Sequence, residues 1–123
     1  MIVIKVWCCL PSDQSEEDLN RLHRAIVKAV VSVSDLCIKD ENDMVCLFPS
    51  GLIKYGLGQE IIVEVSGLPD IPQKNIIVRQ TLARRVGQDV SALYTETRIE
   101  LSVRGFNSSD GFWTSAKLED QKT

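Results

Sequence analysis

The sequence has very little of what a metal or redox centre would need. It contains one histidine, His23, and its four cysteines form no C-x-x-C pair. Zinc sites and redox-active disulfides usually show closely spaced Cys or His residues, so we interpret the cysteines as reduced, buried thiols. We predict no metal and no cofactor.

The chain also lacks long apolar runs and clusters of basic residues. Nothing in it approaches the ~20 consecutive apolar residues that cross a bilayer, and its net charge is −3. A negative chain without a basic patch has no general attraction for nucleic acid or anionic membranes. We therefore expect a cytoplasmic protein that binds neither nucleic acid nor membrane.

The length and composition are those of one ordinary globular domain. The 123 residues are 44% apolar and 25% charged, which is close to the average for globular proteins. A domain of this size buries only about two-thirds of its unfolded surface. Assembly with other subunits would therefore help to stabilise it.

The most informative feature is an internal repeat. Residues 2–11 (IVIKVWCCLP) and residues 60–69 (EIIVEVSGLP) align without gaps. Both segments are rich in β-branched residues, which favours strands. Pro11 and Pro69 mark where each strand ends, because proline cannot donate to a sheet ladder.

A helix is predicted after each of these strands. In the first half, Ser15 precedes three acidic residues in a pattern that resembles a capping box, and Glu17 and Arg21 are spaced to pair on the solvent face. In the second half, Pro72 suits a first helical turn. Apolar residues recur at helical spacing and give each helix one buried stripe. The two stripes are Leu19, Leu22, Ile26, Val30 and Val33, and Val78, Leu82, Val86, Val90 and Leu93.

Each helix leads into a further predicted strand, residues 44–48 in the first half and residues 98–104 in the second. A helix of this length can connect two parallel strands. We therefore predict an α/β (α+β) fold of two fused β-α-β units, with a four-stranded mixed sheet and two helices on one face.

This pattern also divides the chain. A single domain covers residues 1–115, with halves of about 1–58 and 59–115, and residues 116–123 form a polar tail.

The last strand indicates a second surface. Ile99, Leu101 and Val103 alternate with polar residues, so one face of the sheet is apolar and the other is polar. After this strand the chain turns back to Phe112 and Trp113. Exposed aromatics are unfavourable unless covered, so we expect them to dock on a neighbouring subunit.

These features together resemble the tautomerase superfamily, which includes 4-oxalocrotonate tautomerase, macrophage migration inhibitory factor and 5-carboxymethyl-2-hydroxymuconate isomerase. Residues 107–113 (NSSDGFW) are similar to the Asn-rich turn and Gly-x-Trp end of macrophage migration inhibitory factor. The spacing from Ile2 to Pro11 is similar to the family's first strand. The resemblance covers roughly residues 1–115 and implies a homotrimer whose sheets pack around a central axis.

The resemblance also implies where an active site would lie. Catalysis in the family depends on an amino-terminal proline whose secondary amine transfers a proton, and Ile2 stands at that position. Isoleucine hinders methionine removal, so we expect Met1 to stay and to present a primary amine one residue further out. Glu100 aligns with the family's pocket tyrosine and is an alternative carboxylate base, and Ser102 aligns with a nearby asparagine. Lys39 is a candidate for the basic residue after the first helix.

The candidate substrate-binding residues are Arg98, Ser102, Arg104 and Trp113. Paired guanidinium groups suit the small carboxylates that this family binds, so a small carboxylate is the expected ligand. Alternatively, Arg98, Glu100 and Arg104 form a cross-strand charge ladder on the inner surface of the trimer.

From this resemblance we expect a divergent, proline-less member with weak or no keto-enol tautomerase activity on small unsaturated or keto acids. One alternative is a non-catalytic trimer that binds a small acid or another protein. Another is a ferredoxin-like ligand-binding domain, which shares the same order of strands and helices. The Leu-Pro repeat and the aromatic extension argue against the ferredoxin-like domain.

Overall fold

We analysed a computed structural model, which describes residues 1–9, 15–49, 60–69 and 75–115. Along the chain the elements are β1 (Ile2–Cys9), α1 (Glu16–Ser32), η1 (Ser34–Leu36), η2 (Glu41–Asp43), β2 (Met44–Leu47), β3 (Glu60–Pro69), α2 (Ile76–Leu93), β4 (Arg98–Phe106) and η4 (Ser108–Asp110). Pro11, Pro72 and the predicted polar tail lie outside the described residues.

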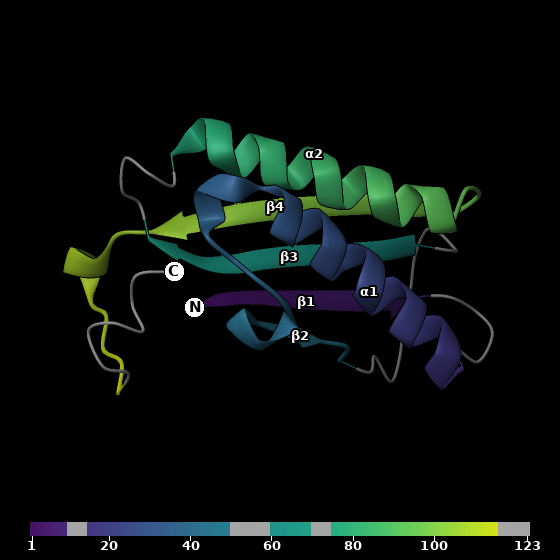
Figure 1. Ribbon diagram of the computed structural model, residues 1–123, viewed down its shortest axis with the longest axis horizontal. Helices are drawn as coiled ribbons and strands as arrows, with labels where there is room; N and C mark the ends of the chain where they lie inside the picture. The colour runs from purple at the N-terminus through teal and green to yellow at the C-terminus, as the bar shows by residue number, and fades with distance from the viewer. Residues whose placement is uncertain (10–14, 50–59, 70–74, 116–123) are drawn as a thin grey trace.

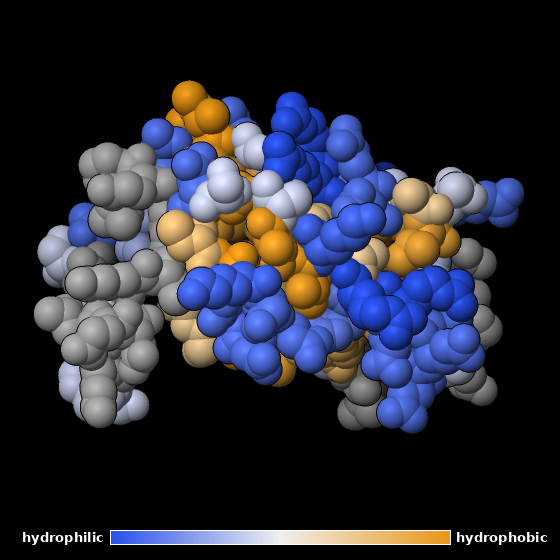
Figure 2. Space-filling model, viewed as in Figure 1, coloured by the Kyte–Doolittle hydropathy of each residue, from blue (hydrophilic) through white to orange (hydrophobic). Residues whose placement is uncertain are grey.

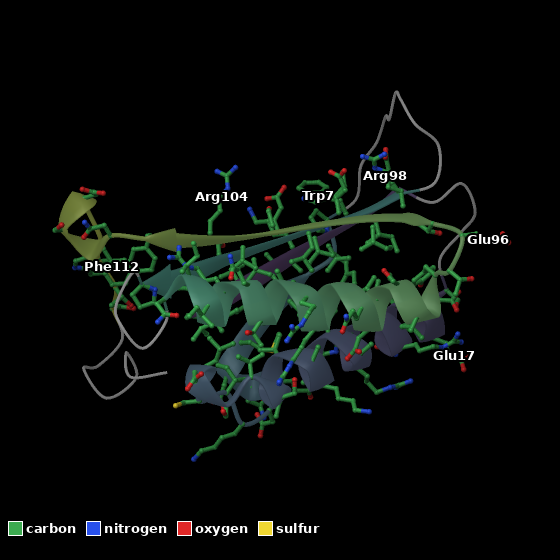
Figure 3. All side chains as sticks on the ribbon, turned by 90° about the horizontal axis from the view of Figure 1, so that it is seen from above. Trp7, Glu17, Glu96, Arg98, Arg104 and Phe112 are labelled. Atoms are coloured by element: carbon green, nitrogen blue, oxygen red, sulfur yellow. The ribbon has the colours of Figure 1, made fainter. Side chains whose placement is uncertain are left out.

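The four strands form one mixed sheet in the order β2-β1-β3-β4. Within each half the two strands are parallel, β1 with β2 and β3 with β4. The halves meet at an antiparallel pair, in which Val6 of β1 lies opposite Val63 of β3. Both helices lie on the same face of the sheet (Figures 1 and 3). This arrangement confirms the predicted fold, and it excludes the ferredoxin-like alternative, because there the two strands of each unit are split by another strand.

The core lies between the sheet and the two helices. Every second residue of β1 and β3 faces it, including Ile4 and Val63, and both are fully buried. The predicted stripes are buried from Leu22 to Val33 and from Val78 to Val90, whereas Leu19 is only half-buried at the start of α1 and Leu93 is exposed at the end of α2. The outer surface of this helical layer is largely hydrophilic, with apolar residues visible between the polar ones (Figure 2).

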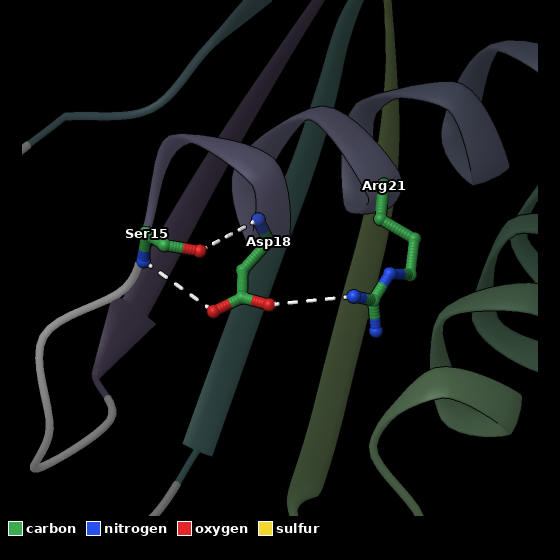
Figure 4. A network of polar contacts seen from close by, with 3 residues as sticks. All are labelled: Ser15, Asp18 and Arg21. Carbon is green, nitrogen blue, oxygen red and sulfur yellow. Dashed lines mark hydrogen bonds and ion pairs between the residues drawn. The ribbon is translucent and has the colours of Figure 1, made fainter.

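The start of α1 confirms the predicted capping box. The Ser15 hydroxyl accepts a hydrogen bond from the Asp18 amide at 3.1 Å, and the Asp18 carboxylate accepts one from the Ser15 amide at 3.4 Å (Figure 4). The same carboxylate pairs with Arg21 at 3.6 Å. Arg21 was predicted to pair with Glu17, but Asp18, three residues away, is the partner found.

The start of α2 differs from the prediction. The helix begins at Ile76, and the side-chain oxygen of Asn75 accepts hydrogen bonds from the amides of Ile77 and Val78. The Asn75 cap satisfies these otherwise unpaired N–H groups. The first turn of α2 therefore starts at Ile76 and not at the predicted proline, which lies outside the described residues.

Two strand ends and two cysteines also differ from the predictions. β2 ends at Leu47, one residue earlier than predicted, and β4 continues to Phe106, two residues further. Cys37, in a left-handed turn (φ 56°) directly after η1, is exposed, and Cys46 is only half-buried, so neither is the buried thiol that was predicted.

The opposite face of the sheet carries no helix. In β4 the predicted alternation is confirmed, with the even-numbered residues from Arg98 to Arg104 exposed. Arg98 and Arg104 both project from this helix-free face (Figure 3). The polar surface that the sequence predicts is therefore present in the subunit.

Candidate functional site

The amino-terminal end of β1 is held closely against β3. Ile2 is only 3% exposed and belongs to the core, whereas Met1 is 69% exposed. Gly67 of β3 has a φ of +87°, and a Cβ built on it would overlap the carbonyl oxygen of Met1. A glycine is needed here both for the left-handed backbone and for the close approach. This contact fixes the position of Met1 relative to β3.

Gly67 belongs to an irregularity of the sheet. The pairing of β3 with β4 shifts register between Val65 and Leu68, so β3 has an extra residue opposite Arg104. Such bulges bend a strand and redirect side chains. Arg104 therefore lies at the same end of the sheet as Met1, two strands away, which corresponds to about 10 Å between main chains.

Arg98 and Glu100 form an ion pair on the helix-free face. The Arg98 Nε and Nη2 atoms donate hydrogen bonds to Glu100 Oε1 at 3.2 and 2.6 Å. These hydrogen bonds and the charge of the Glu100 carboxylate raise the pKa of Arg98 above its ordinary value. Both side chains are more than half exposed. Within the subunit Arg98 is therefore paired with a carboxylate of its own strand, β4.

The predicted catalytic residues are not brought together within one subunit. Glu100 of β4 pairs with Ile62 of β3, and Ile62 pairs in turn with Trp7 of β1. Trp7 is six residues along the chain from Met1. Six residues of strand span about 20 Å. A site that used both the Met1 amine and Glu100 would therefore have to form between subunits.

The remaining predicted site residues are scattered. Ser102 is exposed and is paired across β3 with the Glu64 and Lys5 positions. Lys39 is exposed, and its backbone N–H donates to the Asp43 carboxylate at 2.9 Å. Trp113 lies beyond the end of β4 and is 83% exposed.

The segment after β4 carries Phe112 and Trp113 and is called the aromatic extension here; only part of it packs against its own subunit. The rings of Phe106 and Phe112 are 5.0 Å apart with an interplanar angle of 38°, which is a favourable aromatic contact. Phe112 is nevertheless 51% exposed, and Trp113 more so. Phe112 therefore packs against its own subunit, and Trp113 is the more exposed of the two aromatic residues.

A groove on the helix-free face was not predicted. It measures about 350 Å³ and is lined by Lys5, Trp7, Leu47, Phe48 and Pro49. The one sequence feature that could have indicated it is the alternation of β1, which points Lys5 and Trp7 away from the core. Leu47 of β2 lines the groove because β2 lies beside β1 in the sheet. The sequence pattern does not predict this strand order.

Among the described residues, no group of three His, Cys, Asp or Glu side chains is placed to hold a metal ion. The helices in the described ranges are also too short or too polar to span a membrane.

No family model and no curated protein matches the sequence. Solved structures do match the fold. A fused 4-OT described as an asymmetric trimer (R7) superimposes with a TM-score of 0.71 at 14% identity, over 94% of each chain. Macrophage migration inhibitory factor of Toxoplasma gondii gives 0.62 at 12%, over 93% of this chain and 97% of its own. FG41 malonate semialdehyde decarboxylase, inhibited by 3-bromopropiolate, gives 0.60 at 16%, over 98% and 92%. All three belong to the tautomerase superfamily, and at these identities the likeness is one of fold.

Proposed function

We propose that this chain is a divergent tautomerase-superfamily protein that has lost the proline base and has weak or no keto-enol tautomerase activity. The substrates to test are small unsaturated or keto acids. The observation that carries this proposal is the placement of Ile2. Its side chain is 3% exposed within the core, and the resemblance of residues 2–11 to the family's first strand implies that it stands where the family has its catalytic proline.

The missing amine matters because the family's chemistry is proton transfer. Isoleucine at residue 2 offers no titratable group, and a retained Met1 would put its primary amine one residue further out. A positioned general acid or base contributes typically 10²–10⁴-fold to rate. Loss of this group would therefore leave at most slow turnover, with Met1 or Glu100 as the remaining candidates.

We further propose that the chain assembles as a homotrimer. The fused 4-OT neighbour is described as a trimer, and the exposed Trp113 and helix-free sheet face would be covered in such an assembly. Trimer formation would also bring Glu100, Ser102 and Arg98 of one subunit close to the terminus of another. These residues and Arg104 would then form the small-carboxylate site.

A non-catalytic trimer that binds a small acid or another protein is the second candidate function. The Arg98–Glu100 pair favours it, because an arginine already bound to a carboxylate is a poorer clamp for a substrate. An assay of phenylpyruvate tautomerase activity separates the two candidates. It should compare the natural chain with Ile2→Pro, in which a proline amine is restored.

A further inference from the structure

A second groove, the α2–β4 groove, lies between α2 and the edge strand β4. It measures about 410 Å³, a volume within the range of small binding sites. Its walls include three half-buried apolar residues, Ala83 of α2 and Ile99 and Leu101 of β4. Gly87 leaves the helix side open, because nothing outside its own stretch of helix lies within 4 Å of the position that a Cβ would take. The groove therefore presents an apolar surface that the described part of the subunit leaves uncovered.

The rim of the α2–β4 groove carries an unpaired positive charge. Arg84 is exposed and lines the groove together with Gln88 and Ser91. No ion pair within 4.0 Å joins Arg84 to any residue in the described ranges. A guanidinium group pairs with a carboxylate through two parallel hydrogen bonds, and it also stacks on aromatic rings. An occupant with an aromatic side chain and a nearby carboxylate would match both the walls and the rim.

The aromatic extension of this chain has that combination. Trp113 is 83% exposed, and an aromatic side chain of this kind buries about 150–250 Å² when it is covered. Asp110, three residues earlier, is also exposed, and it has no ion pair with any residue that the structure describes. One short segment therefore carries both an apolar ring and a free carboxylate.

The aromatic extension cannot reach the groove of its own subunit. The groove lies along the first half of β4, at Ile99 and Leu101, whereas the extension leaves the sheet after Phe106. Five residues of strand separate Leu101 from Phe106, which corresponds to about 17 Å. The contact of Phe112 with Phe106 holds the extension at that end, and Figure 3 shows Phe112 and Arg98 near opposite ends of β4. Pairing of the extension with a groove therefore requires a second copy of the chain.

We propose that the α2–β4 groove of one subunit receives the aromatic extension of the next. The Trp113 indole packs on Leu101 and on the open main chain at Gly87. The Asp110 carboxylate pairs with the Arg84 guanidinium at the rim. Such a head-to-tail contact joins two different surfaces, so it can close a ring of three subunits. The inference rests on the proposed homotrimer and names a contact that holds it together outside the helix-free face.

Filling the groove tests the apolar half of this contact. Gly87→Leu places a side chain in open space, so the subunit should stay folded while the indole is blocked. We expect the subunit concentration at half assembly, measured by sedimentation equilibrium, to rise by about tenfold or more. Ala92→Leu adds the same side chain at an exposed position of α2 outside the groove and should change nothing. Far-ultraviolet circular dichroism at high dilution checks that both variants are folded.

Charge reversal tests the polar half. Arg84→Glu and Asp110→Arg each bring like charges together, and each should raise the concentration at half assembly several-fold, with a larger effect at low salt. The double variant Arg84→Glu/Asp110→Arg restores opposite charges and should return this concentration to within about twofold of the natural value. Arg24→Glu, at an exposed position of α1 outside the groove, is the control for net charge and should have little effect.

Fluorine NMR of protein labelled with 5-fluorotryptophan follows the indole itself, and Trp113→Phe identifies its signal. In the natural chain this signal should shift on assembly, and in Gly87→Leu it should keep the position seen at high dilution. A natural chain that is monomeric at every concentration overturns the homotrimer and this contact together. A trimer that assembles equally well with Gly87→Leu, or that shows no recovery in the double reversal, leaves the homotrimer intact and overturns the groove contact alone.

Discussion

The main chain of Met1 lies against the Cα of Gly67, so closely that any side chain on Gly67 would overlap the Met1 carbonyl oxygen. This contact joins the first residue of the chain to the bulge in β3. It places Met1 at the end of the sheet where Arg104 also lies. The position of Met1 therefore depends on a glycine 66 residues further along the sequence.

We predict that Gly67→Ala lowers the free energy of unfolding by about 2–4 kcal/mol, through backbone strain and the overlap with Met1. Chemical denaturation measures this change. Gly111→Ala is the matched control for strain, since Gly111 has a φ of +124° and open space around it. Gly87→Ala, in α2 with open space, should stabilise by about 0.5–1 kcal/mol. Equal losses at Gly67 and Gly111 would mean that the Met1 contact contributes nothing.

The second prediction concerns the aromatic extension. Trp113→Ala should weaken the proposed trimer by roughly 2–4 kcal/mol, as expected for an aromatic residue at an interface. It should leave the stability of the separated subunit unchanged, because Trp113 is 83% exposed there. Sedimentation equilibrium measures the association, and denaturation at high dilution measures the subunit.

Phe112→Ala is the comparison for this experiment. Phe112 packs on Phe106, so its removal should also destabilise the subunit. A natural chain that sediments as a monomer at every concentration would contradict the trimer. An unchanged dissociation constant for Trp113→Ala would contradict the docking role alone.

The third prediction concerns Arg98 and Glu100. Arg98→Gln leaves the Glu100 carboxylate near Glu60, which lies opposite Arg98 on β3. We expect this variant to lower the melting temperature, and the double variant Arg98→Gln/Glu100→Gln to recover part of the loss. The difference should shrink as salt is added, because both side chains are exposed. Additive effects of the two single substitutions would show that the pair is not coupled.

The pH dependence of this pair follows from the sign of the shift. Glu100 raises the pKa of Arg98. The contribution of this pair to the free energy of unfolding is therefore fully present below the pKa that Arg98 has in the unfolded chain. It is lost only as pH rises through the pKa that Arg98 has in the folded protein. Both values lie in the strongly alkaline range. The effect of Arg98→Gln on thermal stability should therefore be constant between about pH 6 and pH 9.

Local patterns were enough to predict the elements and their order. The alternation around Leu101, the helical stripe through Ile26 and the cap at Ser15 are each visible within a few residues, and each is confirmed. The matching of residues 2–11 with 60–69 then gave two equivalent units. Parallel pairing within each unit followed from the length of the connecting helices.

What the sequence could not give depends on residues that meet only through the sheet. The contact of Met1 with Gly67 requires that β1 and β3 be neighbours with a bulge at that point. The groove likewise requires that β2 lie beside β1, so that Phe48 comes close to Trp7. Met1 and Glu100 lie far apart because β1 runs antiparallel to β3 and β4, which places the start of β1 beside the end of β4. Spacing along the chain carries no information on any of the three.

The last prediction tests the missing base directly. The natural chain should show little or no phenylpyruvate or 2-hydroxymuconate tautomerase activity. Ile2→Pro makes the initiating methionine removable and restores a secondary amine at the start of β1. If the pocket is intact, this variant should gain measurable activity, with a pH dependence set by the new amine. Mass spectrometry must confirm that Met1 is removed.

The control for this experiment is Ile2→Leu, which keeps an apolar side chain in the core position and provides no proline amine. Ile2 is buried, so circular dichroism must show that Ile2→Pro remains folded before its activity is judged. If the natural chain already matches proline-bearing relatives in rate, the account of the missing base is wrong. If folded Ile2→Pro lacks Met1 and still gains nothing, the pocket itself has been lost. In that case the non-catalytic binding function is the better conclusion, because restoring the proline amine would not have restored proton transfer.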